Sequence, residues 1–165
     1  GVKDLSIEVR GDNQEQLVAN GVLYNFKYGD KATIKLPCTV EGIKACKELS
    51  ILNIKTNVTL VFSVSQAILC ALAGATYVSP FIGRLDDVST DGTFLISEIR
   101  EIYDNYAFET EILAASVRHT MHIINCAKIG ADVMTGPLNT ITGLLNHPLT
   151  DIGLKKFLDD FKKGN

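Results

Sequence analysis

The sequence predicts an α/β protein built around a parallel β-sheet, and two observations support this prediction. Short apolar segments alternate with segments of helical periodicity at intervals of roughly 20 to 30 residues, as in βα units with right-handed crossovers. Most of the short segments are continuously apolar, as expected for strands covered on both faces. Of the 165 residues, 46% are hydrophobic and 21% charged, so residues 1–165 are expected to form one domain with its own core.

Six segments have the composition of strands, and helical patterns lie between them. The expected strands are 5–9, 32–37, 57–63, 76–82, 110–116 and 131–135. Thr39 is expected to be the N-cap of a helix. An apolar stripe with spacings of four, three and four predicts a later helix through Leu95, Ile99, Ile102 and Tyr106. A last helix is predicted because an apolar stripe lies between an acidic first turn and a basic last turn. The stripe consists of Leu154, Phe157, Leu158 and Phe161.

Six βα units followed by a helix are compatible with two architectures. An open doubly wound sheet is possible, although no glycine-rich turn follows the first strand. A (β/α)8 barrel needs eight strands in roughly 250 residues, which is two units more than this chain supplies.

Composition disfavours several classes of partner. The net charge is −3 and no block of like charges occurs, so neither nucleic acid nor an anionic membrane is favoured. The apolar runs are too short to span a membrane, and the N-terminus lacks the regions of a signal peptide. The cysteines form no C-x-x-C pair, and we expect reduced thiols in the core of a cytosolic protein: Cys38, Cys46, Cys70 and Cys126.

Polar residues lie towards the C-terminal ends of the predicted strands: Glu8, Lys35, Thr59, Arg84, Ser116 and Arg118. In a barrel these ends form one rim, where such enzymes keep their active sites. Lys35 lies in an apolar strand, where a low dielectric favours the neutral amine, a nucleophile that can form a Schiff base with a ketone or aldehyde. The alternative is a lysine that reaches the solvent or pairs with Glu8.

Arg84, Ser116 and Arg118 together predict an anion site, because guanidinium groups and a hydroxyl suit a phosphate monoester. The alternative is that the arginines pair with Asp86 or Asp87 at the surface. His119 and His122 could share a helix face, but no third ligand lies at a useful spacing, so no metal site is predicted. His147 is expected to cap a helix or lie in a loop.

Four segments, TIKLPCTVEGIKACKEL, IKTNVTLVFSVSQAILCALAGATYVSPFIGRLDD, ETEILAASVRH and HPLTDIGLKKFLDDF, resemble the small-subunit transaldolases and the related fructose 6-phosphate aldolases. The resemblance runs from about residue 8 to the C-terminus. It implies a (β/α)8 barrel of which this chain holds strands 3 to 8 and the C-terminal helix. It also implies that the chain lacks the first two units, including an aspartate that transfers protons, so we expect part of a longer protein with weak or no activity of its own.

The resemblance assigns roles to individual residues. Lys35 corresponds to the Schiff-base lysine, and Thr59 and Glu8 to the residues that hold the catalytic water. The phosphate site corresponds to Arg84, Ser116 and Arg118, and the same rim includes Asn57 and Ser79. No metal or organic cofactor is implied, since the iminium ion itself withdraws electrons.

Glu8 and Phe81 resemble the transaldolase pattern at these two positions. The pattern of the aldolases looks like glutamine and tyrosine instead. We therefore expect transfer of a dihydroxyacetone unit between sugar phosphates of the pentose phosphate pathway. The alternatives are a fructose 6-phosphate aldolase-like lyase and a non-catalytic chain that binds phosphate esters. The resemblance also implies homo-oligomers, often decamers, to which the apolar stripe of the last helix could contribute, unless that helix packs on its own barrel.

Overall fold

The structure, a computed structural model, describes residues 4–164 and contains one parallel sheet of six strands; residues 1–3 and 165 of the predicted domain lie outside this range. The strands are β1 (Leu5–Glu8), β2 (Ala32–Pro37), β3 (Thr56–Val61), β4 (Tyr77–Pro80), β5 (Glu111–Ala114) and β6 (Val133–Met134). They lie in chain order, and each pairs in parallel with the next. Because the order never reverses, the sheet is singly wound: the doubly wound alternative is wrong, and the prediction of a partial (β/α)8 barrel is confirmed.

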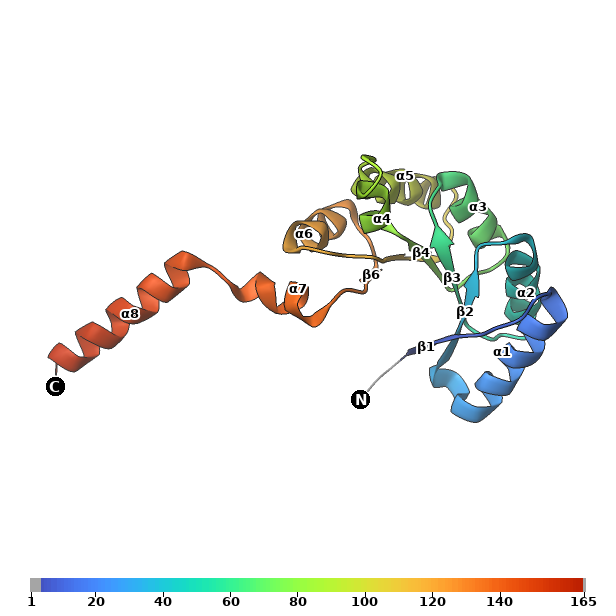
Figure 1. Ribbon diagram of the computed structural model, residues 1–165, viewed down its shortest axis with the longest axis horizontal. Helices are drawn as coiled ribbons and strands as arrows, with labels where there is room; N and C mark the ends of the chain where they lie inside the picture. Colours follow the sequence, from blue (N-terminus) through green and yellow to red (C-terminus); the bar gives the residue numbers. More distant parts are fainter. Residues whose placement is uncertain (1–3, 165) are drawn as a thin grey trace.

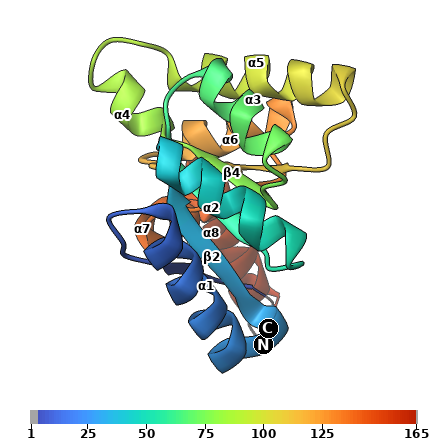
Figure 2. The same cartoon turned by 90° about the vertical axis from the view of Figure 1, so that its right-hand side faces the viewer.

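Among residues 4–164, six helices cover the convex side of this sheet and two more follow them along the chain (Figure 1). They are α1 (Gln14–Tyr28), α2 (Val40–Ile51), α3 (Val64–Leu72), α4 (Ile82–Asp86), α5 (Gly92–Asn105), α6 (Thr120–Ile129), α7 (Leu138–Thr142) and α8 (Pro148–Lys163), with 3-10 turns at Gly29–Lys31 and Gly143–Leu145. In Figure 1 the strands follow an arc from β1 to β6, and α1 to α6 lie outside it. Figure 2 shows α1 and α2 lying across β2. The arrangement is therefore an arc of a barrel rather than a closed one.

All six predicted strands exist, but several end earlier than the apolar pattern suggested. Ser63 ends the third strand because its Oγ accepts a hydrogen bond from the Gln66 N–H (3.3 Å) and so begins α3. Thr39 caps α2 as predicted, accepting from the Gly42 N–H at 3.1 Å. Apolar character alone does not mark such an end, because the cap depends on a single hydrogen bond.

The two faces of the sheet differ in chemistry. The outward-facing side chains are fully buried under the helices: Ile34, Leu36, Val58, Val78 and Ile112. The inward-facing positions are mainly polar: Thr33, Lys35, Asn57, Thr59 and Ser79. The apolar core thus lies between sheet and helices, where each residue removes apolar surface from water, whereas the inner face is left for polar groups.

The last helix, α8, extends away from the arc (Figure 1). It begins at His147, whose Nδ1 accepts from the Leu149 N–H (3.2 Å), so the predicted capping role of His147 is confirmed. None of its residues is buried, and Phe157 and Phe161 are 73% and 71% exposed, so α8 does not pack on its own barrel. Within residues 4–164, no helix has both the length and the hydrophobicity that crossing a membrane requires.

Candidate active site

A cavity of about 630 Å³ lies on the inner face of the sheet. Inward-pointing residues from all six strands line it: Asp4, Ser6, Thr33, Lys35, Asn57, Thr59, Tyr77, Ser79, Phe81, Leu113, Ala115, Ser116, Val133, Met134 and Thr135. Parallel strands in register place side chains of equal parity on one face, which explains this convergence. Six residues that the sequence predicts for a substrate site lie together in this cavity: Lys35, Asn57, Thr59, Ser79, Phe81 and Ser116.

Lys35 projects into this cavity from the middle of β2 and is half-buried. Its register partners are Glu8 on β1 and Asn57 on β3. Between residues 4 and 164, no carboxylate oxygen lies within ion-pair distance of the Lys35 amine. The alternative of a Glu8–Lys35 ion pair is therefore not what the structure shows; Glu8 itself is exposed at the end of β1.

Asn57 is the centre of a hydrogen-bond chain across the inner face. The Ser79 hydroxyl donates to Asn57 Oδ1 (2.6 Å), and Asn57 Nδ2 donates to Ser6 Oγ (3.0 Å). The chain fixes the orientation of the amide and links β4, β3 and β1 past the strand that carries Lys35. Ser6 was not predicted as a site residue, although it lies two residues before Glu8 and therefore points to the same face of the sheet.

Thr59 has a polar atom without a protein partner. Its side chain is 6% exposed and lines the cavity, and within the described part of the chain Thr59 Oγ1 makes no hydrogen bond. A β-bulge follows it, with Leu60 in the left-handed region (φ 61°). Bulges redirect side chains next to active sites, and an unpaired buried hydroxyl costs about 1–3 kcal/mol. The hydroxyl is thus available to a bound ligand or water.

The three residues of the expected phosphate site are arranged differently. Ser116 lines the cavity, in the left-handed region (φ 60°). Arg84 does not line the cavity, but its guanidinium carbon lies 5.6 Å from the centroid of the Phe81 ring, which does. Arg118 instead forms a two-pronged ion pair with Asp87, in which Nη2 lies 2.6 Å from Oδ2. For Arg118, the surface-pair alternative describes the structure, and its hydrogen bonds hold the pKa of Asp87 below its usual value.

Residues 2–164 match the family described as Transaldolase/Fructose-6-phosphate aldolase. The chain belongs to this family. It is 63% identical to a probable transaldolase of Flavobacterium psychrophilum, 59% to one of Cytophaga hutchinsonii and 54% to one of Phocaeicola vulgatus, each over 162 residues that cover 98% of this chain and 74% of the relative. Among solved structures, a lactate oxidase of Pediococcus acidilactici superimposes with a TM-score of 0.59 at 15% identity, covering 82% of this chain and 48% of that chain, and supports the fold alone.

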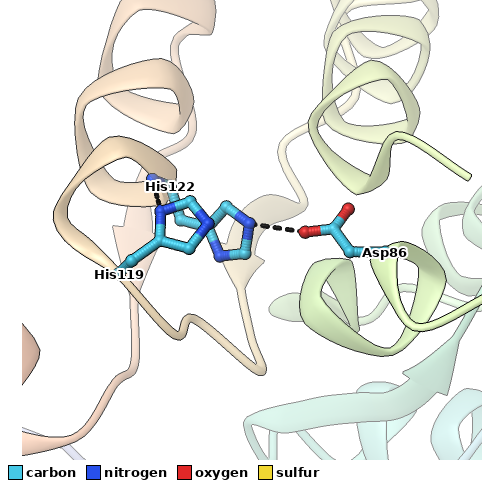
Figure 3. A group of neighbouring side chains, drawn as sticks. All are labelled: Asp86, His119 and His122. Carbon is cyan, nitrogen blue, oxygen red and sulfur yellow. Dashed lines mark hydrogen bonds and ion pairs between the residues drawn. The ribbon is translucent and has the colours of Figure 1, made fainter. Parts of the chain in front are cut away.

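Beside the cavity of this transaldolase/fructose-6-phosphate aldolase family member, the structure assembles a group that sequence spacing did not reveal. Asp86, His119 and His122 bring potential metal-ligand atoms within 4.8 Å of one another (Figure 3). The two histidines lie close in sequence, but Asp86 comes from α4, so only the packing of α4 against the start of α6 supplies a third group.

Hydrogen bonds to both rings argue against a metal at this cluster. His122 Nδ1 accepts from the Arg118 N–H (3.2 Å), and His119 Nδ1 accepts from the His122 N–H (3.3 Å). Each neutral ring therefore carries its hydrogen on Nε2. His122 donates that hydrogen to Asp86 Oδ2 at 2.6 Å. A metal would need the Nε2 lone pairs, and hence the loss of these hydrogen bonds.

Proposed function

We propose that this chain carries the Schiff-base chemistry of a transaldolase, moving a dihydroxyacetone unit from a ketose phosphate to an aldose phosphate. The observation that carries the proposal is the amine of Lys35, half-buried in a cavity of polar inward-facing residues and without a carboxylate partner in the described chain. The nitrogen lone pair of such an amine is a nucleophile that attacks carbonyl carbon to form a Schiff base.

In the proposed reaction, the Lys35 nitrogen attacks the ketose carbonyl, and the carbonyl oxygen leaves as water to give an iminium ion. The bond between the third and fourth carbons then breaks. Its electron pair moves into the iminium to form an enamine, while the hydroxyl on the fourth carbon loses its proton and an aldose phosphate departs. The enamine adds to the carbonyl carbon of a second aldose phosphate, and water releases the new ketose. The donor would be fructose 6-phosphate or sedoheptulose 7-phosphate. The acceptor would be glyceraldehyde 3-phosphate or erythrose 4-phosphate.

Other residues of the site would divide the remaining tasks. Thr59 Oγ1, which has no partner within the described residues, is suited to hold the water that shuttles protons, together with Glu8 at the end of β1, the strand on the other side of β2. Asn57 and Ser79, oriented by their mutual hydrogen bond, would bind the hydroxyls of the dihydroxyacetone unit. Arg84 and Ser116 would bind phosphate, with Arg118 joining them if its pair with Asp87 opens.

Phe81 favours transfer over simple aldol cleavage. Its ring lines the cavity and offers no hydroxyl for an additional proton transfer. A lyase related to fructose 6-phosphate aldolase is the second candidate. Substitution Phe81→Tyr is expected to raise cleavage of fructose 6-phosphate without an acceptor, relative to transfer with one. An unchanged ratio of the two rates would favour the lyase.

The test of the proposal is borohydride reduction of the protein with fructose 6-phosphate, followed by intact mass and peptide mapping. We expect a dihydroxyacetone-derived adduct on Lys35, none in Lys35→Met, and an unchanged adduct in Lys44→Met, which alters a surface lysine paired with Glu41. The same reaction should be run on this chain joined to the N-terminal segment of the Flavobacterium relative. An adduct only in the extended protein would assign the chemistry to the full barrel; no adduct in either would disprove the Schiff base and leave phosphate-ester binding without catalysis.

Assembly and location form part of the proposal. The exposed apolar side chains of α8 are suited to packing on a second copy of the chain, in a homo-oligomer such as the decamer that the resemblance implies. Replacing both Phe157 and Phe161 by aspartate is expected to lower the mass measured by sedimentation; an unchanged mass would exclude α8 from the interface. The four free cysteines are consistent with the expected cytosolic location.

A further inference from the structure

The pair formed by His122 and Asp86 lies outside the cavity, yet it touches the segment that carries the candidate phosphate site. His122 is 4% exposed in the first turn of α6. Its two ring nitrogens bond in opposite directions, Nδ1 to the Arg118 main-chain N–H (3.2 Å) and Nε2 to Asp86 (2.6 Å), as Figure 3 shows for the latter. The imidazole thus bridges the β5–α6 segment and α4.

Asp86 also binds α5, and so connects a third element to the His122 imidazole. Its Oδ1 accepts from the Gly92 N–H at 3.0 Å, at the start of α5. The next residue, Asp87, holds the guanidinium of Arg118. Arg118 is therefore held at both ends, at its main-chain N–H by His122 and at its side chain by Asp87. Two adjacent carboxylates of the β4 unit fix one residue of the β5 unit.

The two segments approach so closely that their relative position leaves little freedom. A Cβ added to Gly83 would lie 2.2 Å from the Ser116 carbonyl oxygen and 2.7 Å from Arg118 Nε. Ser116 is held in a left-handed conformation (φ 60°), which for a residue with a side chain costs of order 1–3 kcal/mol and persists only where its surroundings enforce it. The Thr140 hydroxyl adds a bond to the Arg118 carbonyl (3.2 Å).

We propose that His122 and Asp86 are positioning residues for the phosphate group of the substrate: they hold Ser116 in its strained conformation, at the correct distance from Arg84. This inference rests on the proposed function for its ligand, but it concerns anion binding and not the chemistry of Lys35. Neither His122 nor Asp86 lines the cavity. Their loss is therefore expected to weaken phosphate binding while the amine remains reactive.

Two substitutions separate the bonds of His122. Asparagine can place its Oδ1 where His122 Nδ1 accepts the Arg118 N–H, whereas alanine removes both bonds. His147→Asn is the matched control, since it alters a histidine that caps α8 and touches no residue of the site. Thermal unfolding of each variant checks that the protein is folded at the temperature of the assay.

The experiment compares two probes on the same proteins: inorganic phosphate binding by calorimetry, and borohydride trapping of dihydroxyacetone, which has no phosphate. His122→Ala is expected to weaken phosphate binding about tenfold. The same variant should change the dihydroxyacetone concentration for half-maximal trapping by less than about twofold. The phosphate affinity of His122→Asn should lie between those of His122→Ala and the wild type, and His147→Asn should bind phosphate like the wild type. The inference would be overturned if His122→Ala bound phosphate with unchanged affinity. It would also be overturned if the variant lost phosphate affinity and dihydroxyacetone trapping to the same extent. If neither this chain nor its N-terminally extended form traps dihydroxyacetone but the phosphate effect is found, the Schiff-base proposal fails and the positioning role stands.

Discussion

The two faces of the sheet are built from neighbouring residues of the same strands, but one face is apolar and the other is mainly polar. On the outer face, Leu36 is fully buried in the apolar core, and on the inner face Lys35, one residue earlier, lines a polar cavity. Tyr103, buried on the helical side, has a partner: its hydroxyl donates to the Ala67 carbonyl at 2.7 Å, and burial raises the pKa of this phenol. On the inner face, Thr59 Oγ1 has no such partner within the described residues.

This comparison separates stability from function. Apolar burial and satisfied hydrogen bonds on the outer face stabilise the arc, so substitutions there should act on unfolding. The inner face retains an amine and a hydroxyl that contribute little to stability but can bind a substrate, so substitutions there should act on chemistry. Five substitutions test this division.

The largest effect is expected for Lys35→Met on the inner face. Transaldolase activity and adduct formation should fall by at least about 10³-fold, because no other side chain replaces the nucleophile. The free energy of unfolding should stay within about 1 kcal/mol, since the half-buried amine forms no ion pair with the described residues. Enzyme assay and urea denaturation measure the two quantities; marked destabilisation would show that the inner face also supports the fold.

Leu36→Ala on the outer face should do the opposite. Deleting a fully buried leucine costs about 2–5 kcal/mol of unfolding free energy, through lost burial and the cavity left behind. The variant that remains folded at low temperature should still form the Lys35 adduct. Urea unfolding read by circular dichroism gives the stability. A loss below 1 kcal/mol would contradict the assignment of this face as the core.

Two buried threonines offer a matched pair with a smaller effect. The Thr110 hydroxyl donates to the Ala75 carbonyl at 2.7 Å, so Thr110→Val should cost about 1–2 kcal/mol by leaving that carbonyl unpaired. Thr59→Val removes a buried hydroxyl without a partner in the described chain, and the burial of such a hydroxyl costs about 1–3 kcal/mol, so the free energy of unfolding should stay the same or rise by up to that amount. Activity should fall only in Thr59→Val. Equal stability losses in both variants would mean that Thr59 is paired in solution.

The smallest effect concerns Asp4 at the floor of the cavity. Its carboxylate pairs with Lys55 and accepts from the Tyr77 hydroxyl (3.3 Å); chiefly the hydrogen bond from Lys55 lowers its pKa below the ordinary 3.8. A depressed pKa means that the unfolded state takes up the proton first. The stabilisation is therefore present above pH 3.8 and is lost as the pH falls through the folded-state value. Asp4→Asn should flatten this acid-side decline in melting temperature, and an unaltered decline would refute it.

The sequence was a good guide to the elements and a partial guide to the site. The strands were predictable because their apolar runs are short and separated by helical periods, and the inward residues followed from strand parity. Ser6 and the pairing of Asp86 with His122 were not predicted: a serine in a strand gives no signal by itself, and Asp86 becomes a partner of His122 only in the folded chain. The partner of the Arg118 side chain could not be predicted either, since a guanidinium group binds phosphate and carboxylate alike.

Local pattern and composition thus determined the class of fold, the positions of the strands along the chain and Lys35 as a candidate Schiff-base lysine, because these depend on periodicity and on the type of single residues. Tertiary structure alone decided which groups became partners. It paired Arg118 with Asp87, aligned Ser79, Asn57 and Ser6, and left α8 exposed. The physical reason is that a hydrogen bond or ion pair requires two groups within about 3 Å, and such proximity between distant segments arises only from packing.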